Sequence, residues 1–308
     1  MSIIEKAIEK MGKKDVAQDA DKKVSGEKVG DSIDDTPESQ VPLEEQSEER
    51  VFIEEPASKN SIELDFNILR QHGMVVPDNT RSKIADEYRL IKRPLLMNAA
   101  GKGASIVENA NLIMVTSSVP SEGKTFSSIN LAMSIALERD KHVLLVDADV
   151  SRPSVSRVLN LGQKPGLIDM LVDKKSTFSD LVLKTNIPNL SILTSGRAHP
   201  HSTELLASDE MKSLTNELSK RYADRIVIFD SPPILATTEA AVLANHMGQI
   251  VMVVEAGHTQ QKLVKEALSR LNEPEILGFI LNKTIGGVMG GEYDYSYGYY
   301  GGGYAAEK

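Results

Sequence analysis

The stretch LIMVTSSVPSEGKTFSS, residues 112–128, decides the fold of this chain. It opens with four apolar residues, LIMV, which are typical of a buried strand, and continues into a loop of small and polar residues. Apolar residues then recur at helical spacing: Ile129, Leu131, Ala132, Ile135 and Ala136. We therefore predict a strand, a polar loop and a helix, in that order.

The loop ends in Gly123-Lys124-Thr125, directly before the predicted helix. Its backbone N–H groups and the helix N-terminus would form a pocket of partial positive charge that suits a polyphosphate. Lys124 could reach the terminal phosphates, and Thr125 could ligate Mg²⁺. The strict pattern GxxxxGK[ST] requires glycine where this chain has Ser118, so the match is one residue short. The predicted nucleotide-binding residues are Ser118, Val119, Pro120, Ser121, Glu122, Gly123, Lys124, Thr125 and Phe126.

Two further apolar runs end in aspartates. VLLVDADVSRP, residues 143–153, carries Asp147 and Asp149, and IVIFDSPP, residues 226–233, carries Asp230. The carboxyl ends of parallel strands line the ligand crevice of such a sheet, so these carboxylates should lie beside the polar loop. Acidic side chains there are suited to holding Mg²⁺ next to a triphosphate.

Strands and helices alternate through the rest of this region. We predict short helices at 153–160 and 166–172, a strand at 190–193 and a helix at 208–222 with Ser208 as N-cap. A helix at 237–246, a strand at 250–254, a helix at 260–271 and a strand at 277–281 follow the Asp230 strand. The fold class is therefore α/β, a mostly parallel sheet with helices on both faces, like that of P-loop NTPases.

The three motifs, in this order, resemble the Walker A, A′ and B motifs of the bacterial tyrosine kinases. The resemblance covers about residues 82–304. MSIIEKAIEKM, EYRLIKRPLL and DADVSRP are similar to the tyrosine autokinases of exosortase-type exopolysaccharide operons. The chain departs from the family pattern at Ser121, where glycine is usual, and at Ser151, where arginine is usual.

The resemblance implies transfer of the γ-phosphoryl group of ATP, with Mg²⁺, to tyrosine. Lys124 would bind the β- and γ-phosphates, and Thr125, Asp149 and Asp230 would hold the metal. Asp147 would orient or deprotonate the incoming phenol. Asn282, after the last predicted strand, sits where related ATPases place an adenine-contacting asparagine.

A further helix is predicted at 82–93, just before Pro94. The family carries Glu-x-x-Arg-x-x-Arg at a subunit interface, matched here by Asp86, Arg89 and Lys92. A solvated helix face is the alternative interpretation of these charges.

Composition bounds the two ends of the chain. Residues 1–14 have the pattern of a short amphipathic helix, and residues 15–60 read as an acidic disordered linker. Residues 1–60 hold sixteen acidic and nine basic residues, so they carry −7 of the total net charge of −9. The remaining domain, 61–285, is nearly neutral, which gives no indication of nucleic-acid binding. The chain has no cysteine and no apolar run of the ~18 residues that a membrane span requires.

The C-terminal tail, 286–308, is rich in glycine and holds six of the eight tyrosines: Tyr293, Tyr295, Tyr297, Tyr299, Tyr300 and Tyr304. Such a segment is flexible and packs poorly. Beside a phosphate-binding loop and paired acidic motifs, it is predicted to be the phosphoacceptor. A low-complexity tail for weak association is the alternative.

The resemblance also implies a cellular setting. It predicts a cytoplasmic protein recruited to the membrane by a chain-length-determinant (Wzz-like) activator, a ring-shaped homo-oligomer and a cognate phosphotyrosine phosphatase. Two other functions fit the motifs: a positioning ATPase of the ParA/MinD type, or a nucleotide-binding scaffold without catalysis. The first has a signature lysine where this chain has Val119, and the second does not require Lys124 and the three aspartates.

Overall fold

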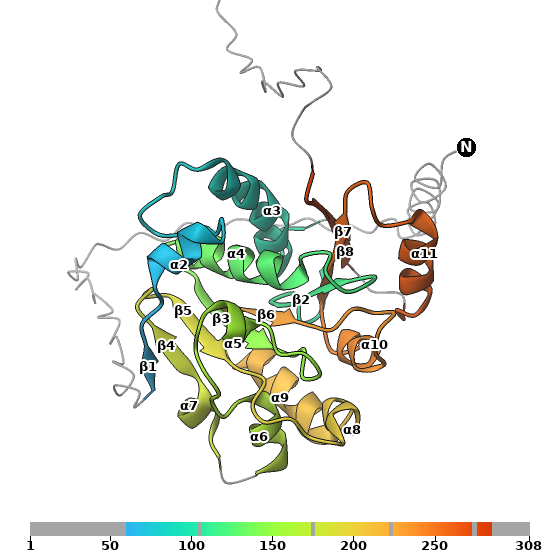
Figure 1. Ribbon diagram of the computed structural model, residues 1–308. Coiled ribbons are helices and arrows are strands. Elements are labelled where there is room, and N and C mark those ends of the chain that lie inside the picture. Colours follow the sequence, from blue (N-terminus) through green and yellow to red (C-terminus); the bar gives the residue numbers. More distant parts are fainter. Residues whose placement is uncertain (1–59, 104–105, 174–175, 222–223, 273–275, 285–308) are drawn as a thin grey trace, which may run out of the picture. The chain divides into compact units, whose positions relative to one another are not determined.

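The computed structural model describes residues 60–103, 106–173, 176–221, 224–272 and 276–284 (Figure 1). The strands in this part are β1 (Ser61–Ile62), β2 (Leu112–Ser117), β3 (His142–Asp147), β4 (Leu183–Thr185), β5 (Leu190–Leu193), β6 (Arg225–Asp230), β7 (Gln249–Glu255) and β8 (Ile276–Asn282). The helices are α2 (Phe66–Gln71), α3 (Lys83–Ala99), α4 (Lys124–Ala136), α5 (Val155–Val158), α6 (Leu167–Val172), α7 (Phe178–Leu181), α8 (Ser202–Leu206), α9 (Asp209–Lys220), α10 (Glu239–Ala244) and α11 (Gln261–Ser269). The predicted N-terminal helix, the tail and all but the last residue of the linker lie outside the described residues.

The strands form one sheet in the order β1-β4-β5-β3-β6-β2-β7-β8. Neighbouring strands are parallel except β4 and β5, so the predicted mostly parallel sheet is confirmed. β6 lies between β2 and β3. The strands that lead into the three predicted motifs are therefore adjacent, and their carboxyl ends meet at one edge.

Helices cover both faces of the sheet, each over its own core. Leu112 and Met114 of β2 face the side covered by α6, α8, α9 and α10, whereas Ile113 and Val115 face α3 and α4. Figure 1 shows α3 and α4 on one side of the sheet and α9 on the other. Because both faces are covered, β2 is buried along its whole length, and each large side chain in it contributes about 1.5–3 kcal/mol by burial.

The helix at Lys83–Ala99 runs past the boundary predicted at Arg93. Pro94 lies inside it and removes one intrahelical N–H donor. Packing offsets that loss, because Leu95 is buried in the core after the proline. One turn farther on, the Asn98 amide donates to Gln249 Oε1 of β7 at 2.9 Å. The predicted end of the helix at Arg93 is therefore wrong, because contacts made after Pro94 stabilise its continuation to Ala99.

Several short elements are absent from the sequence prediction, namely β1, α2, α7, β4 and α8. None exceeds six residues, and a pattern this short seldom repeats often enough to identify an element. The longer predicted elements are confirmed with ends shifted by a few residues. Ser208 caps α9 as predicted, since its hydroxyl accepts from Met211 N at 3.3 Å.

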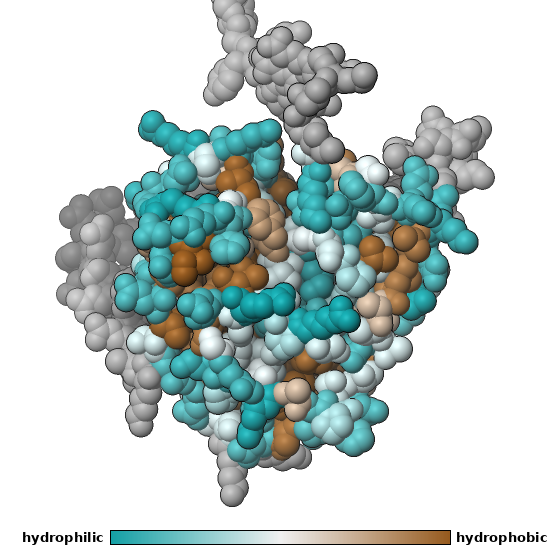
Figure 2. Space-filling view, viewed as in Figure 1, coloured by the Kyte–Doolittle hydropathy of each residue, from teal (hydrophilic) through white to brown (hydrophobic). Residues whose placement is uncertain are grey.

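The described helices include none long and apolar enough to cross a lipid bilayer. On the face drawn in Figure 2, hydrophobic residues gather in separate patches between hydrophilic ones. This is the ordinary surface of a folded domain whose main cores lie under the helices.

Asp169, at the start of α6, joins two segments that are distant in sequence. Its Oδ2 atom accepts from Gly166 N at 3.0 Å and Arg197 N at 3.1 Å, and Oδ1 accepts from Arg197 Nε at 2.6 Å. Burial alone would raise the pKa of this carboxyl, but the hydrogen bonds from Arg197 and Gly166 lower it below its ordinary value. We call this set of contacts the Asp169 latch.

We expect Asp169→Asn to lower the free energy of unfolding at pH 7 by about 1.5–3 kcal/mol, the range for hydrogen bonds to a charged group. The folded-state pKa is lowered, so the carboxylate's contribution is complete above its ordinary value of 3.8 and is lost as pH falls below it. Urea unfolding from pH 7 to pH 3 should therefore show the difference between the two proteins shrinking below about pH 4. Exposed Asp140→Asn is the matched control. A deficit that stays constant over this pH range would contradict the role of the charge.

Candidate functional site

The phosphate-binding loop follows β2, as predicted. Gly123 has φ +97°, a left-handed conformation that favours glycine, and it serves as the N-cap of α4. A Cβ atom at this position would lie 2.0 Å from the Asn282 amide nitrogen. The backbone conformation therefore favours glycine here, and any larger residue would also displace the Asn282 side chain.

Hydrogen bonds brace the loop from within and from β7 and β8. Glu122 is buried, and its carboxylate accepts from Val119 N at 2.8 Å and from Thr259 Oγ1 at 2.5 Å. Asn282 Nδ2 donates to Glu122 O at 2.9 Å, and Lys283 Nζ donates to Ser121 O at 2.7 Å. The structure thus places Asn282 against the loop, and no contact here tests the predicted adenine contact. No spacing in the sequence linked Glu122 to Thr259.

Lys124 and the predicted acidic residues do come together. Lys124 Nζ lies 2.6 Å from Asp149 Oδ2, and both side chains are buried. Thr125 Oγ1 donates to Asp230 Oδ2 at 2.7 Å, and Ser128 Oγ donates to Asp230 Oδ1 at 3.0 Å. Ser128 was not predicted, although its position one helical turn after Lys124 puts it on the same side of α4.

Asp147 lies behind Asp149. Its side chain is fully buried, and its oxygens accept from Asp149 N at 3.3 Å and Val155 N at 3.0 Å. Asp147 therefore organises the segment between β3 and α5, which we call the A′ segment (residues 148–154). Asp149, in contrast, lines the open cleft beside the loop.

The site holds more buried negative than positive charge. Burial raises the pKa of Asp147 to about 8, with a further contribution from the nearby Asp230 charge. Burial likewise raises the pKa of Asp230. For Lys124, burial alone would lower the pKa, but the carboxylates of Asp230 and Asp149 raise it. Burial thus disfavours full ionisation of the three carboxyl groups around this one ammonium, and a further cation would stabilise their charged forms.

This donor set fits Mg²⁺ bound together with a nucleotide. A divalent cation would stabilise the charged forms of these carboxylates, and Thr125, Asp149 and Asp230 supply the oxygen ligands that Mg²⁺ prefers. In the described residues no three His, Cys, Asp or Glu side chains gather into an all-protein metal cage.

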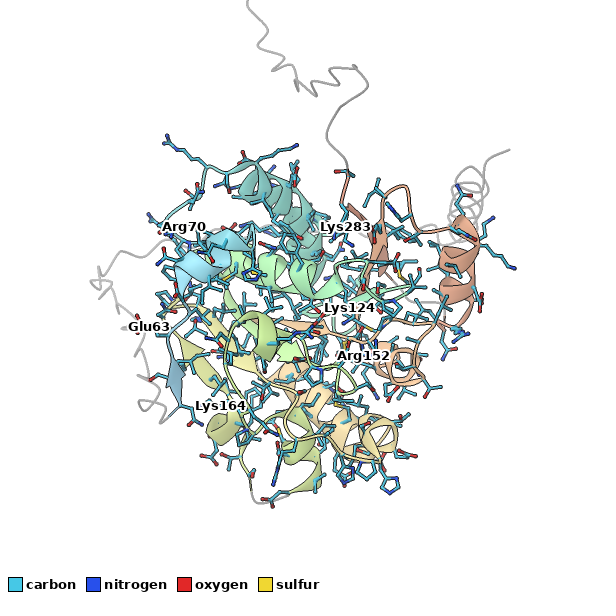
Figure 3. All side chains as sticks on the ribbon, viewed as in Figure 1. Glu63, Arg70, Lys124, Arg152, Lys164 and Lys283 are labelled. Carbon is cyan, nitrogen blue, oxygen red and sulfur yellow. The ribbon has the colours of Figure 1, made fainter. Side chains whose placement is uncertain are left out.

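A cleft of about 770 Å³ opens over these residues. Its volume is within the range of small-molecule sites, roughly 300–1,000 Å³. The phosphate-binding loop and α4 line one side, through residues that include Ser121, Lys124 and Phe126. The A′ segment and the loop after β6 line the other side, through Ser151, Arg152 and Pro232 among others. Figure 3 shows Lys124 near the middle of this face and Arg152 close to it.

The three residues of the predicted interface signature are placed differently from one another. Asp86 and Arg89 are exposed and form an ion pair within α3, and Arg89 also donates to Thr80 O. Lys92 is buried instead: its Nζ atom lies 2.6 Å from Ser134 O and 2.5 Å from Glu138 Oε1. Because α3 packs on α4, Lys92 bonds within its own chain, and its place in a subunit interface stays a prediction. The six tail tyrosines lie outside the described residues.

Comparison with known proteins adds independent information. A family model described as "AAA domain" matches residues 111–272. The chain is similar to tyrosine-protein kinase YwqD of Bacillus subtilis, with 34% identity over 234 residues, 75% of this chain and 92% of that protein. It is also similar to the putative tyrosine-protein kinase CapB of Staphylococcus aureus, at 32% identity over 68% of this chain and 89% of that protein. Tyrosine-protein kinase wzc of Salmonella typhimurium is 34% identical, but the match covers only 26% of its length.

Solved structures agree with these relatives. The kinase domain of Escherichia coli tyrosine kinase ETK has a TM-score of 0.54 and 31% identity, covering 61% of this chain and 72% of that one. The chimerical protein CapA2B2 has a TM-score of 0.56 and 27% identity, covering 71% and 92%. With the three motifs assembled at one sheet edge and relatives of this identity and coverage, the chain belongs to the bacterial tyrosine kinase family.

Proposed function

We propose that this protein is an ATP-dependent protein-tyrosine kinase that phosphorylates the tyrosines of its own C-terminal tail. The observation that carries the proposal is the assembled site: Lys124 and Thr125 at the N-terminus of a buried helix, paired with Asp149 and Asp230. Similarity to proteins named as tyrosine-protein kinases supports the activity. Six tyrosines within the last 23 residues supply acceptors.

In the proposed reaction, a tail phenol oxygen forms a bond to the γ-phosphorus of ATP while the bond from that phosphorus to the β-phosphate oxygen breaks. ADP leaves with the electron pair, and the phenol proton passes to a carboxylate or to solvent. Lys124 and the loop amides hold the phosphates, and Thr125, Asp149 and Asp230 would hold the magnesium ion. When bound, that ion supplies compensation for the charge that develops on the phosphate oxygens.

Asp147 is the proposed proton acceptor. One feature of its surroundings favours that role, and one opposes it. Its carboxyl lies near Lys124, Asp149 and Asp230, the groups proposed to hold the phosphates and the metal. Its oxygens, however, are already bonded to backbone N–H groups of the A′ segment. The role therefore requires Asp147 to share or give up one of these hydrogen bonds during transfer.

The setting that we propose, regulation of exopolysaccharide export from the cytoplasmic side of the membrane, is supported by the sequence resemblance. So are the chain-length-determinant activator, the ring and the phosphatase. Asp86 and Arg89 line a surface cleft of about 620 Å³ together with exposed Leu90 and Met97, which supports α3 as a subunit contact. Asn282 remains our proposed adenine contact.

Intact-mass measurement after incubation with Mg²⁺ and ATP tests the activity. We expect the native chain to gain several phosphates, and Lys124→Met to gain them at least ~100-fold more slowly, because it lacks the cation that faces the phosphates. Exposed Lys262→Met is the matched control and should behave like the native chain. A variant with all six tail tyrosines changed to Phe should gain none. ATP hydrolysis by the native chain without any mass gain would instead favour a positioning ATPase, and nucleotide binding without hydrolysis would favour a scaffold.

Asp147→Asn separates a catalytic from an architectural role. If Asp147 accepts the phenol proton, kcat should fall by about 10²–10⁴, the usual contribution of a general base, while KM for ATP stays within about twofold. Steady-state kinetics of tail phosphorylation, with thermal unfolding in parallel, measures both. If KM for ATP rises and the unfolding temperature falls, while kcat stays near the native value, the residue only supports the A′ segment.

A further inference from the structure

A second cleft, of about 460 Å³, adjoins the nucleotide cleft. Pro153 and Arg157 line both clefts, so α5 and the end of the A′ segment form the wall between them. The rest of its lining comes from the loop before α6 and the loop after β5, and includes Asn160, Gln163, Lys164 and Ser195. None of these residues was assigned a role by the sequence motifs.

The framework of this cleft is fixed by close contacts. The Asp169 latch ties the backbone at Gly166 to that at Arg197, and so joins the two loops that carry much of the lining. A Cβ atom at Gly166 would lie 2.0 Å from Thr194 O, so the two loops approach as closely as glycine permits. Thr194 Oγ1 also donates to Pro165 O at 3.0 Å. These contacts hold the two loops in place, so the fold itself sets the position of the cleft walls.

Positively charged side chains line both the second cleft and the nucleotide cleft beside it. Arg157 and Lys164 are exposed in the second cleft, and Arg152 is exposed in the first. Within the described residues, none of the three has a carboxylate at ion-pair distance, and the Arg157 side chain bonds only to Ser154 Oγ at 3.2 Å. Arg197, in contrast, is paired with Asp169. Figure 3 shows Arg152 close to Lys124 and Lys164 farther out.

The position of the second cleft suits an acceptor rather than a nucleotide. In phosphoryl transfer the attacking oxygen approaches roughly in line with the leaving group, opposite the phosphates that the loop holds. The phosphate-binding loop lines one side of the nucleotide cleft, and the A′ segment lines the other. A chain that delivers a phenol from the second side would pass over Pro153 and Arg157 and lie in the second cleft.

The tail has the complementary charge. Its tyrosines begin in the sequence EYDYSYGYY, where Glu292 and Asp294 flank Tyr293. In an extended segment, alternate side chains point to opposite sides, so these two carboxylates would share one side and Tyr293 and Tyr295 the other. Two carboxylates on one side match two unpaired cations in a cleft.

We propose that Arg157 and Lys164 are the residues that recognise the acceptor, by binding the carboxylates of Glu292 and Asp294 in the tail. This inference rests on the proposed kinase function and adds to it a binding site for the substrate. It makes the enzyme selective for tyrosines with acidic neighbours. It also gives the A′ segment a second task, that of guiding the acceptor toward Lys124 and Asp149.

The test uses the full chain with its six tail tyrosines changed to Phe and its Glu292 and Asp294 changed to Gln, so that its own tail does not compete, and a peptide of residues 288–300 as acceptor. We expect Arg157→Gln and Lys164→Gln each to raise the KM for the peptide by up to about fivefold, the effect of losing a partly exposed ion pair. The double variant should raise it further, with kcat at saturating peptide little changed. Arg139→Gln is the matched control, because Arg139 is exposed just beyond the far end of α4, about 20 Å from the loop.

A double-mutant cycle shows whether the charges act on each other. A peptide with Glu292→Gln and Asp294→Gln should bind the unaltered kinase as weakly as the normal peptide binds the double variant. Combining both changes should then cost little more than either alone. Additive losses, or an unchanged KM for the altered peptide, would overturn this inference while leaving the kinase function intact. If the unaltered kinase fails to phosphorylate the normal peptide, both the function and the inference fail.

Discussion

The buried ion pair between Lys124 and Asp149 is the interaction on which the site depends. Lys124 is the one ammonium at this sheet edge to face Asp147, Asp149 and Asp230 among the described residues, and each of the four is at most 8% exposed. Removing a buried charge from water is costly unless a partner compensates it. The parallel strand order supplies those partners, since β3 and β6 bring their aspartates to the end of β2. The order of the strands in the sheet therefore determines which charges meet at the site.

The two loop serines that stand where glycine is usual, Ser121 in the family pattern and Ser118 in the strict loop pattern, have different surroundings. Ser121 takes a left-handed conformation, φ +71°, which costs a residue other than glycine about 1–2 kcal/mol. The hydrogen bond from Lys283 to Ser121 O offsets part of that cost. Ser118 is fully buried near Met252, where a small side chain fits. Glu122 completes the loop by accepting from Val119 N, the position at which the ParA/MinD type carries its signature lysine.

Sequence patterns predicted the long elements and the central residues, because those depend on local periodicity and on strand ends. The strands at β2, β3 and β6, and the convergence of Lys124, Asp149 and Asp230, followed from that logic. Contacts between distant segments could not be predicted in this way. The continuation of α3 beyond Pro94 depends on Gln249, the burial of Lys92 depends on Glu138, and the brace on Glu122 depends on Thr259. Such pairs are more than forty residues apart and carry no spacing signal.

The point at which the chain leaves the folded domain limits the distance that each tail tyrosine can reach. Asn282 and Lys283 are bonded to the phosphate-binding loop, and Thr284 is the last described residue. Tyr293 follows nine residues later, and an extended chain spans at most about 3.6 Å per residue, so its reach from that point is about 30 Å. Tyr304 follows twenty residues later, with a reach of about 70 Å. The number of residues after Thr284 therefore sets an upper limit on how far each tyrosine can lie from the nucleotide cleft, and that limit more than doubles from Tyr293 to Tyr304.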